Sequence, residues 1–154
     1  MIETGTLKKL NFFKVYDENE LKVFSERLMP EEFSDHHPVF RENQIGDDSM
    51  FIILEGAVKI TKKQKTEEKV LANIREGEFF GEMSLLRPAP WSASAITIRP
   101  SKLIRLTDSD YNSFKKDYPG IVVKLNDIFL DVLIKRLREA DKRLVKDGHG
   151  SGAV

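Results

Sequence analysis

The sequence predicts a mainly β domain, in which short strands form a sandwich or roll with helices before and after it. Short apolar runs separated by turn residues fill the segment 38–106, which is typical of many short strands. Apolar residues at helical spacing precede and follow that segment. The chain has 154 residues and no cysteine, so one core of ordinary size has to stabilise it without disulfides.

The N-terminal segment 5–30 is predicted to form a small helical bundle. Apolar residues gather between positions 7 and 13, and an acidic start, Asp17-Glu18-Asn19-Glu20, follows them. This start leads into the apolar residues Leu21, Val23, Phe24 and Leu28, as in an amphipathic helix. We expect Pro30 to end this helix.

The β-roll is predicted over residues 36–107. Residues 50–54 form a continuous apolar run, and residues 57–61 alternate between apolar and polar side chains, which indicates two strands. A charged hairpin tip at 62–69 returns into a strand at 70–74, and two further strands are expected at 92–98 and 103–106.

The C-terminal segment 108–146 is predicted to form two helices that complete a domain spanning residues 1–146. Thr107 and Asp110 are placed to cap a short helix that reaches about Asp117, and Pro119-Gly120 breaks it. A long helix is then expected from about 121 to 146. The remaining residues, 147–154, are rich in glycine and are predicted to form a flexible tail.

The long helix carries two apolar stripes. One fits a face packed on the roll and consists of Ile121, Leu125, Ile128, Phe129 and Val132. The other has roughly heptad spacing and consists of Val123, Leu130, Leu133, Leu137, Ala140 and Leu144. We expect this second stripe to form a parallel homodimer, and the alternative is that it covers the N-terminal bundle of the same chain.

A short segment between the strands has the chemistry of an anion site. Gly81 allows close approach of the backbone, and the residues after it are predicted to begin a helical turn whose free N–H groups point at an anion. The carboxylate of Glu82 could accept a hydrogen bond from a sugar hydroxyl. The segment therefore predicts a binding site for an anionic ligand.

This segment resembles the phosphate-binding cassette of the cyclic-nucleotide-binding domain family, as found in the sensor domains of cyclic AMP receptor protein and FNR-like regulators. The matching residues are Phe80-Gly81-Glu82-Met83-Ser84-Leu85-Leu86, followed by Pro90, Ser92 and Ala93. A second match, from Gly46 to Gly56, fits the family's turn pattern. The resemblance covers about residues 5–145 and implies a jelly-roll-like β-roll, or double-stranded β-helix, with a long C-terminal helix that caps the ligand.

The resemblance also implies the ligand-binding residues Gly81, Glu82, Met83, Ser84, Trp91, Ser92 and Ala93, with Glu82 on the ribose 2′-hydroxyl. Trp91 occupies the position where the family has its phosphate-binding arginine, and its indole carries no charge. We therefore expect ordinary cyclic AMP binding to be weak, altered or absent.

Three hypotheses remain for Trp91. The indole fills the vacated pocket and no cyclic nucleotide binds, or it serves as a stacking face for an altered ligand. In the third, Arg87, four residues earlier in the chain, replaces the lost charge.

Composition excludes several function classes. With 25 basic and 25 acidic side chains, no overall field draws the chain to nucleic acid or to an anionic membrane. The sequence has no apolar run long enough for a signal peptide or a membrane span, so we expect a cytoplasmic protein. His36, His37 and His149 are expected to be solvated, and no metal site or catalytic grouping is predicted.

The sequence thus predicts a non-catalytic regulatory or sensor module whose ligand is a cyclic nucleotide or another anionic nucleotide. One alternative is a ligand-free module that binds an unidentified protein partner besides forming a homodimer. Another is a truncated transcription regulator, because the eight residues after the long helix cannot form a DNA-binding domain.

Overall fold

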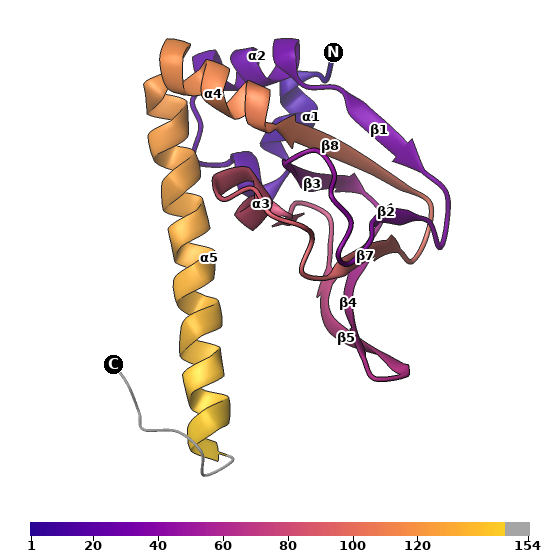
Figure 1. Ribbon diagram of the computed structural model, residues 1–154. Helices are drawn as coiled ribbons and strands as arrows, with labels where there is room; N and C mark the ends of the chain where they lie inside the picture. The colour runs from indigo at the N-terminus through magenta and orange to yellow at the C-terminus, as the bar shows by residue number, and fades with distance from the viewer. Residues whose placement is uncertain (147–154) are drawn as a thin grey trace.

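Two antiparallel sheets of four strands each form the β-roll in the computed structural model (Figure 1), which describes residues 1–146. The first sheet has the order β1-β8-β3-β6, and the second has the order β2-β7-β4-β5. The strands are β1 (Pro30–Phe33), β2 (Pro38–Phe40), β3 (Ser49–Glu55), β4 (Val58–Gln64), β5 (Glu67–Ile74), β6 (Phe79–Phe80), β7 (Ser94–Thr97) and β8 (Ser101–Thr107). The predicted fold class is confirmed, and the predicted tail 147–154 lies outside the described residues.

The N-terminal segment forms α1 (Thr4–Lys8), a 3-10 turn η1 (Asn11–Phe13) and α2 (Glu18–Arg27). α2 begins where the acidic signal predicts, because Asp17 and Glu20 form a reciprocal capping box. Pro30 ends the helical region but also begins a strand, since residues 30–33 pair with β8. The first strand therefore begins at residue 30, whereas the sequence analysis predicted that the roll starts at residue 36.

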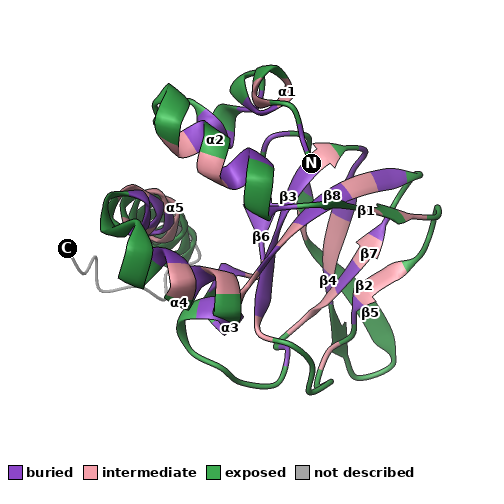
Figure 2. Ribbon diagram, turned by 90° about the horizontal axis from the view of Figure 1, so that it is seen from above, coloured by how far each residue is buried: buried purple, intermediate pink, exposed green. Residues whose placement is uncertain are grey.

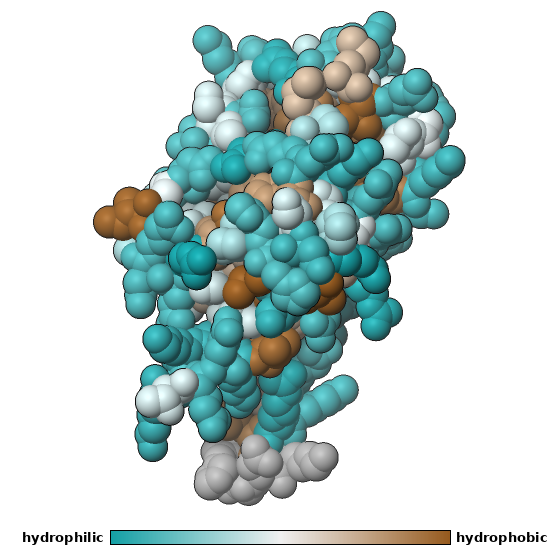
Figure 3. All heavy atoms as spheres, turned by 90° about the vertical axis from the view of Figure 1, so that its right-hand side faces the viewer, coloured by the Kyte–Doolittle hydropathy of each residue, from teal (hydrophilic) through white to brown (hydrophobic). Residues whose placement is uncertain are grey.

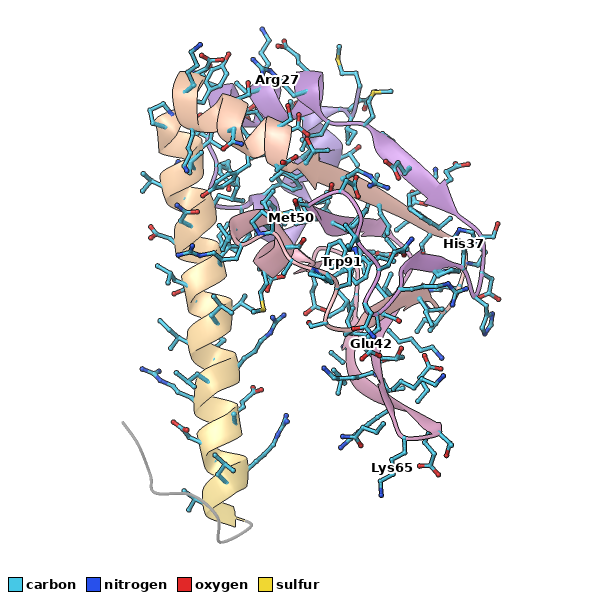
Figure 4. The ribbon with its side chains drawn as sticks, viewed as in Figure 1. Arg27, His37, Glu42, Met50, Lys65 and Trp91 are labelled. Carbon is cyan, nitrogen blue, oxygen red and sulfur yellow. The ribbon has the colours of Figure 1, made fainter. Side chains whose placement is uncertain are left out.

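The β4–β5 hairpin is more regular than its charges predict. The strands stay paired as far as Gln64 and Glu67, so the tip is reduced to Lys65 and Thr66, with Lys65 at a φ of 56°. Figure 4 shows Lys65 at the outer end of this hairpin. The segment 62–69, expected to be the hairpin tip, is thus largely strand.

The roll contains a short helix, α3 (Glu82–Leu86), and the C-terminal helices are α4 (Asp108–Asp117) and α5 (Pro119–Lys146). Thr107 and Asp110 form the capping box of α4, as predicted. α5 begins at Pro119, whose fixed φ and missing N–H suit the first turn of a helix. In Figure 1, α5 runs past the whole height of the roll.

The first half of α5 belongs to the core of the protein. Ile121, Leu125 and Phe129 are buried, while Ile128 and Val132 pack partly against the same cluster. The ring of Phe129 lies 5.5 Å from that of Phe79 in β6. Figure 2 shows the buried side of α5 turned toward the sheets and the other helices.

The heptad stripe of α5 is left uncovered by its own chain. Val123, Leu130 and Leu137 are 61%, 54% and 64% exposed, Leu144 and Ala140 are exposed, and Leu133 is half-buried. The alternative that the N-terminal helices of the same chain bury this stripe therefore does not hold. By contrast, Figure 3, which views the roll from the side away from α5, shows only scattered apolar patches among hydrophilic side chains.

Among the described residues, no helix combines the length and the apolar character that crossing a bilayer requires.

Candidate functional site

A cavity of about 640 Å³ lies between the roll and α5. Its size is within the range of small-molecule binding sites. The strands β2, β4, β5 and β6 contribute Phe40, Ile60, Leu71, Ala72, Ile74 and Phe80, and α5 contributes Arg136, Glu139 and Arg143. The remaining wall is formed by the segment that the sequence singles out, residues 81–84, 87 and 89–93.

All seven predicted ligand-binding residues line this one cavity: Gly81, Glu82, Met83, Ser84, Trp91, Ser92 and Ala93. The fold therefore brings together the two parts of the motif, which the sequence separates by the loop after α3. Figure 4 shows Trp91, which belongs to that loop, between α3 and the strands of the second sheet.

Gly81 fixes the path of the chain into α3. It has a φ of 85° as the residue that precedes the helix, a conformation that side chains other than glycine rarely adopt. A Cβ atom here would lie 3.0 Å from the carbonyl oxygen of Ser49 and 3.6 Å from the indole of Trp91. The glycine thus packs α3 directly against β3 and the wall of the cavity.

Glu82 is a buried carboxylate that has a single charged partner among residues 1–146. Its side chain is 3% exposed, and its Oε1 accepts a hydrogen bond of 2.9 Å from Nη1 of Arg136 on α5. Arg136 itself is about half exposed. This ion pair links the first turn of α3 to the second half of α5, and both residues line the cavity.

Ser84 and Met83 complete the α3 side of the cavity. Ser84 is buried and donates a hydrogen bond of 2.9 Å from Oγ to Oδ1 of Asp48. Met83 is 62% exposed, so its side chain lies at the mouth. Of the two remaining predicted residues, Ser92 is exposed and Ala93 is half-buried.

Trp91 is a fixed part of the cavity wall. Its indole is 8% exposed and stacks on the ring of Phe40 with a centroid separation of 3.7 Å and an interplanar angle of 8°. Its backbone bonds to Asn43 and Gln44 of the loop 41–48. The indole occupies one wall, and a cavity remains beside it.

The loop 41–48 supports this aromatic wall from the outside. Asp47 pairs with Arg105 of β8, which also makes two hydrogen bonds with Glu31 and lies over the ring of Phe51 at 4.8 Å. The hydrogen bond to Glu31, followed by the one to Asp47, raises the pKa of Arg105 above its ordinary value against the opposing effect of burial. These contacts fasten the loop to the first sheet.

The resemblance implies that the long helix caps the ligand, but the sequence analysis named no ligand-binding residue on it. Arg136, Glu139 and Arg143 of α5 line the cavity. A signal was present: these residues continue, at helical spacing, the stripe of Leu125, Phe129 and Val132 that faces the roll. The stripe changes from apolar to charged where the helix passes over the cavity.

The segment that forms the roll matches a known protein family. A family model described as "Cyclic nucleotide-binding domain" matches residues 30–118, more than half of the chain. The "CRP-like cAMP-activated global transcriptional regulator" of Mycobacterium tuberculosis is 30% identical over 139 residues, which are 90% of this chain and 60% of that protein. The "Cyclic AMP receptor protein" of Thermus thermophilus is 32% identical over 125 residues, 80% of this chain and 54% of that protein.

A solved structure gives the same result. The crystal structure of the Thermus thermophilus catabolite activator protein superimposes with a TM-score of 0.75 at 27% identity, covering 89% of this chain and 62% of that one. The chain therefore spans between about half and two thirds of the length of these relatives.

Proposed function

Because this chain belongs to the cyclic nucleotide-binding domain family, we propose that it is a non-catalytic regulatory module that senses a small ligand in the cavity under α5. We further propose that its phosphate-binding cassette is degenerate, so cyclic AMP and cyclic GMP bind weakly or not at all. The observation that carries this proposal is the buried Trp91, stacked on Phe40, at the position of the cassette cation.

The charges around the cassette explain the expected loss of affinity. A phosphate placed beside Gly81 and Ser84 would lie close to the carboxylate of Glu82, and Arg136 already neutralises that carboxylate. No cation among the lining residues takes the place of Trp91 within the 89–93 segment. Losing a charge-assisted contact of this kind costs about 1.5–3 kcal/mol, which is roughly one to two decades of affinity.

The ligand signal would reach other proteins through α5. The Glu82–Arg136 bond makes the second half of this helix part of the cavity, and the exposed stripe of Val123, Leu130, Leu137 and Leu144 is the surface that we expect to form the homodimer. A ligand that changes the position of Arg136 would thereby change the same helix that dimerises. Since the sequence lacks cysteine, its chemistry suits the reducing cytoplasm, where we expect the protein to act.

Calorimetric titration of the wild type and of Trp91→Arg with cyclic AMP and cyclic GMP tests the cassette. We expect the wild type to bind either nucleotide weakly or not at all, and Trp91→Arg to gain at least about tenfold in affinity. Trp91→Phe is the matched control, since it keeps an aromatic wall without adding a cation. Micromolar binding by the wild type that the arginine does not improve would refute the degenerate cassette.

Sedimentation of Leu137→Glu tests the dimer. A carboxylate in the middle of the exposed stripe should give monomers, because it would be buried unpaired in the interface. Lys135→Glu places the same carboxylate on the opposite face of α5 and should leave the dimer intact. An unchanged mass for Leu137→Glu would rule out this interface.

A second candidate function is a ligand-free module that binds another protein through the α5 stripe. The exposure of Leu130 and Leu137 favours a partner of some kind and is common to both functions. A monomeric wild type that binds no small molecule would favour this second function.

A further inference from the structure

The cations that line the cavity come from α5 and from the end of α3. Arg136 and Arg143 come from α5, and Arg87 directly follows α3. Arg136 is neutralised by Glu82. Within the described part of the chain, no ion pair is formed by the side chains of Arg87 and Arg143, so both guanidinium groups remain available to an anion.

The side chains that line the cavity carry more positive than negative charge. Three arginines face two carboxylates, Glu82 and Glu139, among the lining residues. The loss of the cassette cation at Trp91 therefore does not make the cavity neutral or acidic. It moves the positive charge to the side formed by α3 and α5.

The roll side of the cavity is apolar and includes three aromatic side chains. Phe40 and Trp91 stack face to face, and Phe80 lies 5.9 Å from Phe40 and stacks on Phe51. Aliphatic side chains of β4 and β5 continue this wall: Ile60, Leu71, Ala72 and Ile74. Such a surface favours a flat apolar ring over a hydrated sugar or phosphate.

From this division we infer that the ligand is a planar aromatic anion, such as an aromatic carboxylate, with its ring against Trp91 and its charge turned toward Arg87 and Arg143. The inference rests on the proposed function and names the class of ligand for that same cavity. It reverses the polarity that the cassette implies, because the anion binds on the α5 side rather than at the N-terminus of α3.

Calorimetric titration with naphthoate, its neutral analogue naphthamide and cyclic AMP tests the inference on the whole chain. We expect naphthoate to bind about tenfold more tightly than naphthamide, since only the carboxylate makes charge-assisted bonds. Arg87→Gln and Arg143→Gln should each weaken naphthoate binding by about twofold to fivefold, the range for exposed ion pairs, and leave naphthamide unchanged. Arg138→Gln, on α5 but outside the cavity lining, is the matched control.

The outcomes separate this inference from the proposed function. Equal binding of naphthoate and naphthamide, or naphthoate binding that neither arginine variant affects, would overturn the position of the charge. Tight binding of cyclic AMP without naphthoate binding would overturn the ligand class but leave a ligand-sensing module standing. Binding of none of the three probes would overturn the inference. The proposed function is tested separately, by the sedimentation of Leu137→Glu and the titration of Trp91→Arg.

Discussion

Replacing Arg136 with methionine should destabilise the protein, because it leaves the carboxylate of Glu82 buried without its cation. The pair is intermediate in character, with Glu82 3% and Arg136 48% exposed. Exposed pairs contribute about 0.2–1 kcal/mol, and breaking a fully buried pair costs about 3–5 kcal/mol. We therefore expect Arg136→Met to lose about 1.5–3 kcal/mol of unfolding free energy.

Urea unfolding followed by circular dichroism measures this loss, and a double-mutant cycle with Glu82→Gln isolates the interaction. For a chain of this size, about 2–4 °C per kcal/mol gives a melting temperature lower by roughly 3–12 °C. The coupling free energy of Glu82 and Arg136 should be at least about 1 kcal/mol. Arg138→Met, two positions along the same helix, should stay within about 0.5 kcal/mol of the wild type.

A coupling free energy near zero, with Arg136→Met as stable as Arg138→Met, would refute the reasoning. It would mean that α5 is not tied to α3 in solution, and that the route from the cavity to the dimer stripe has to be sought elsewhere.

Three further predictions concern stability. Tyr16→Phe should raise the free energy of unfolding by about 1 kcal/mol, because Tyr16 Oη is buried without a hydrogen-bond partner among the described residues. Burial, followed by the charge of Glu20, raises the pKa of the Tyr16 phenol well above its usual range. The wild type should therefore lose stability as the pH rises above about 10, where this tyrosine ionises in the unfolded chain. In a pH series of urea unfolding, Tyr16→Phe should lack this loss of stability. Thr107→Ala removes the cap of α4 and should cost about 1 kcal/mol, measured by thermal unfolding, with an effect below about 0.3 kcal/mol counting against the capping box. Gly56→Ala should destabilise by more than about 1–2 kcal/mol, since a Cβ atom would lie 2.2 Å from Oγ of Ser101 at a φ of 104°, and an unchanged urea midpoint would contradict this geometry.

Features set by neighbouring residues could be predicted from the sequence. The capping boxes of Asp17 and Thr107, and the turn at Gly81, depend on residues within one helical turn. Such rules need only neighbouring residues, so the starts of α2 and α4 were predicted correctly. The family resemblance added the arrangement of the strands, which local rules do not give.

Features that depend on distant partners were missed. β1 contains Glu31 and Glu32 and looks unlike a strand, but it pairs with β8 at the edge of a sheet, where Arg105 satisfies Glu31. The stacking of Phe40 on Trp91 likewise joins residues from different parts of the chain. The contact of Arg136 with Glu82 could not be predicted, because it depends on which part of the roll lies beneath this turn of α5.

The inner face of α5 is apolar up to Val132 and charged beyond it, so the two halves of this helix differ in local stability. Up to Val132 its inner face is buried in the core, so amide hydrogens there should exchange only through global unfolding. Beyond it, the ion pair of Arg136 is the only one that the described part of the helix makes with the roll, so in a single chain the backbone can open by fraying from the C-terminus. The exchange rates of backbone amides in this outer half should therefore change when a ligand fills the cavity, before those in the rest of the protein change.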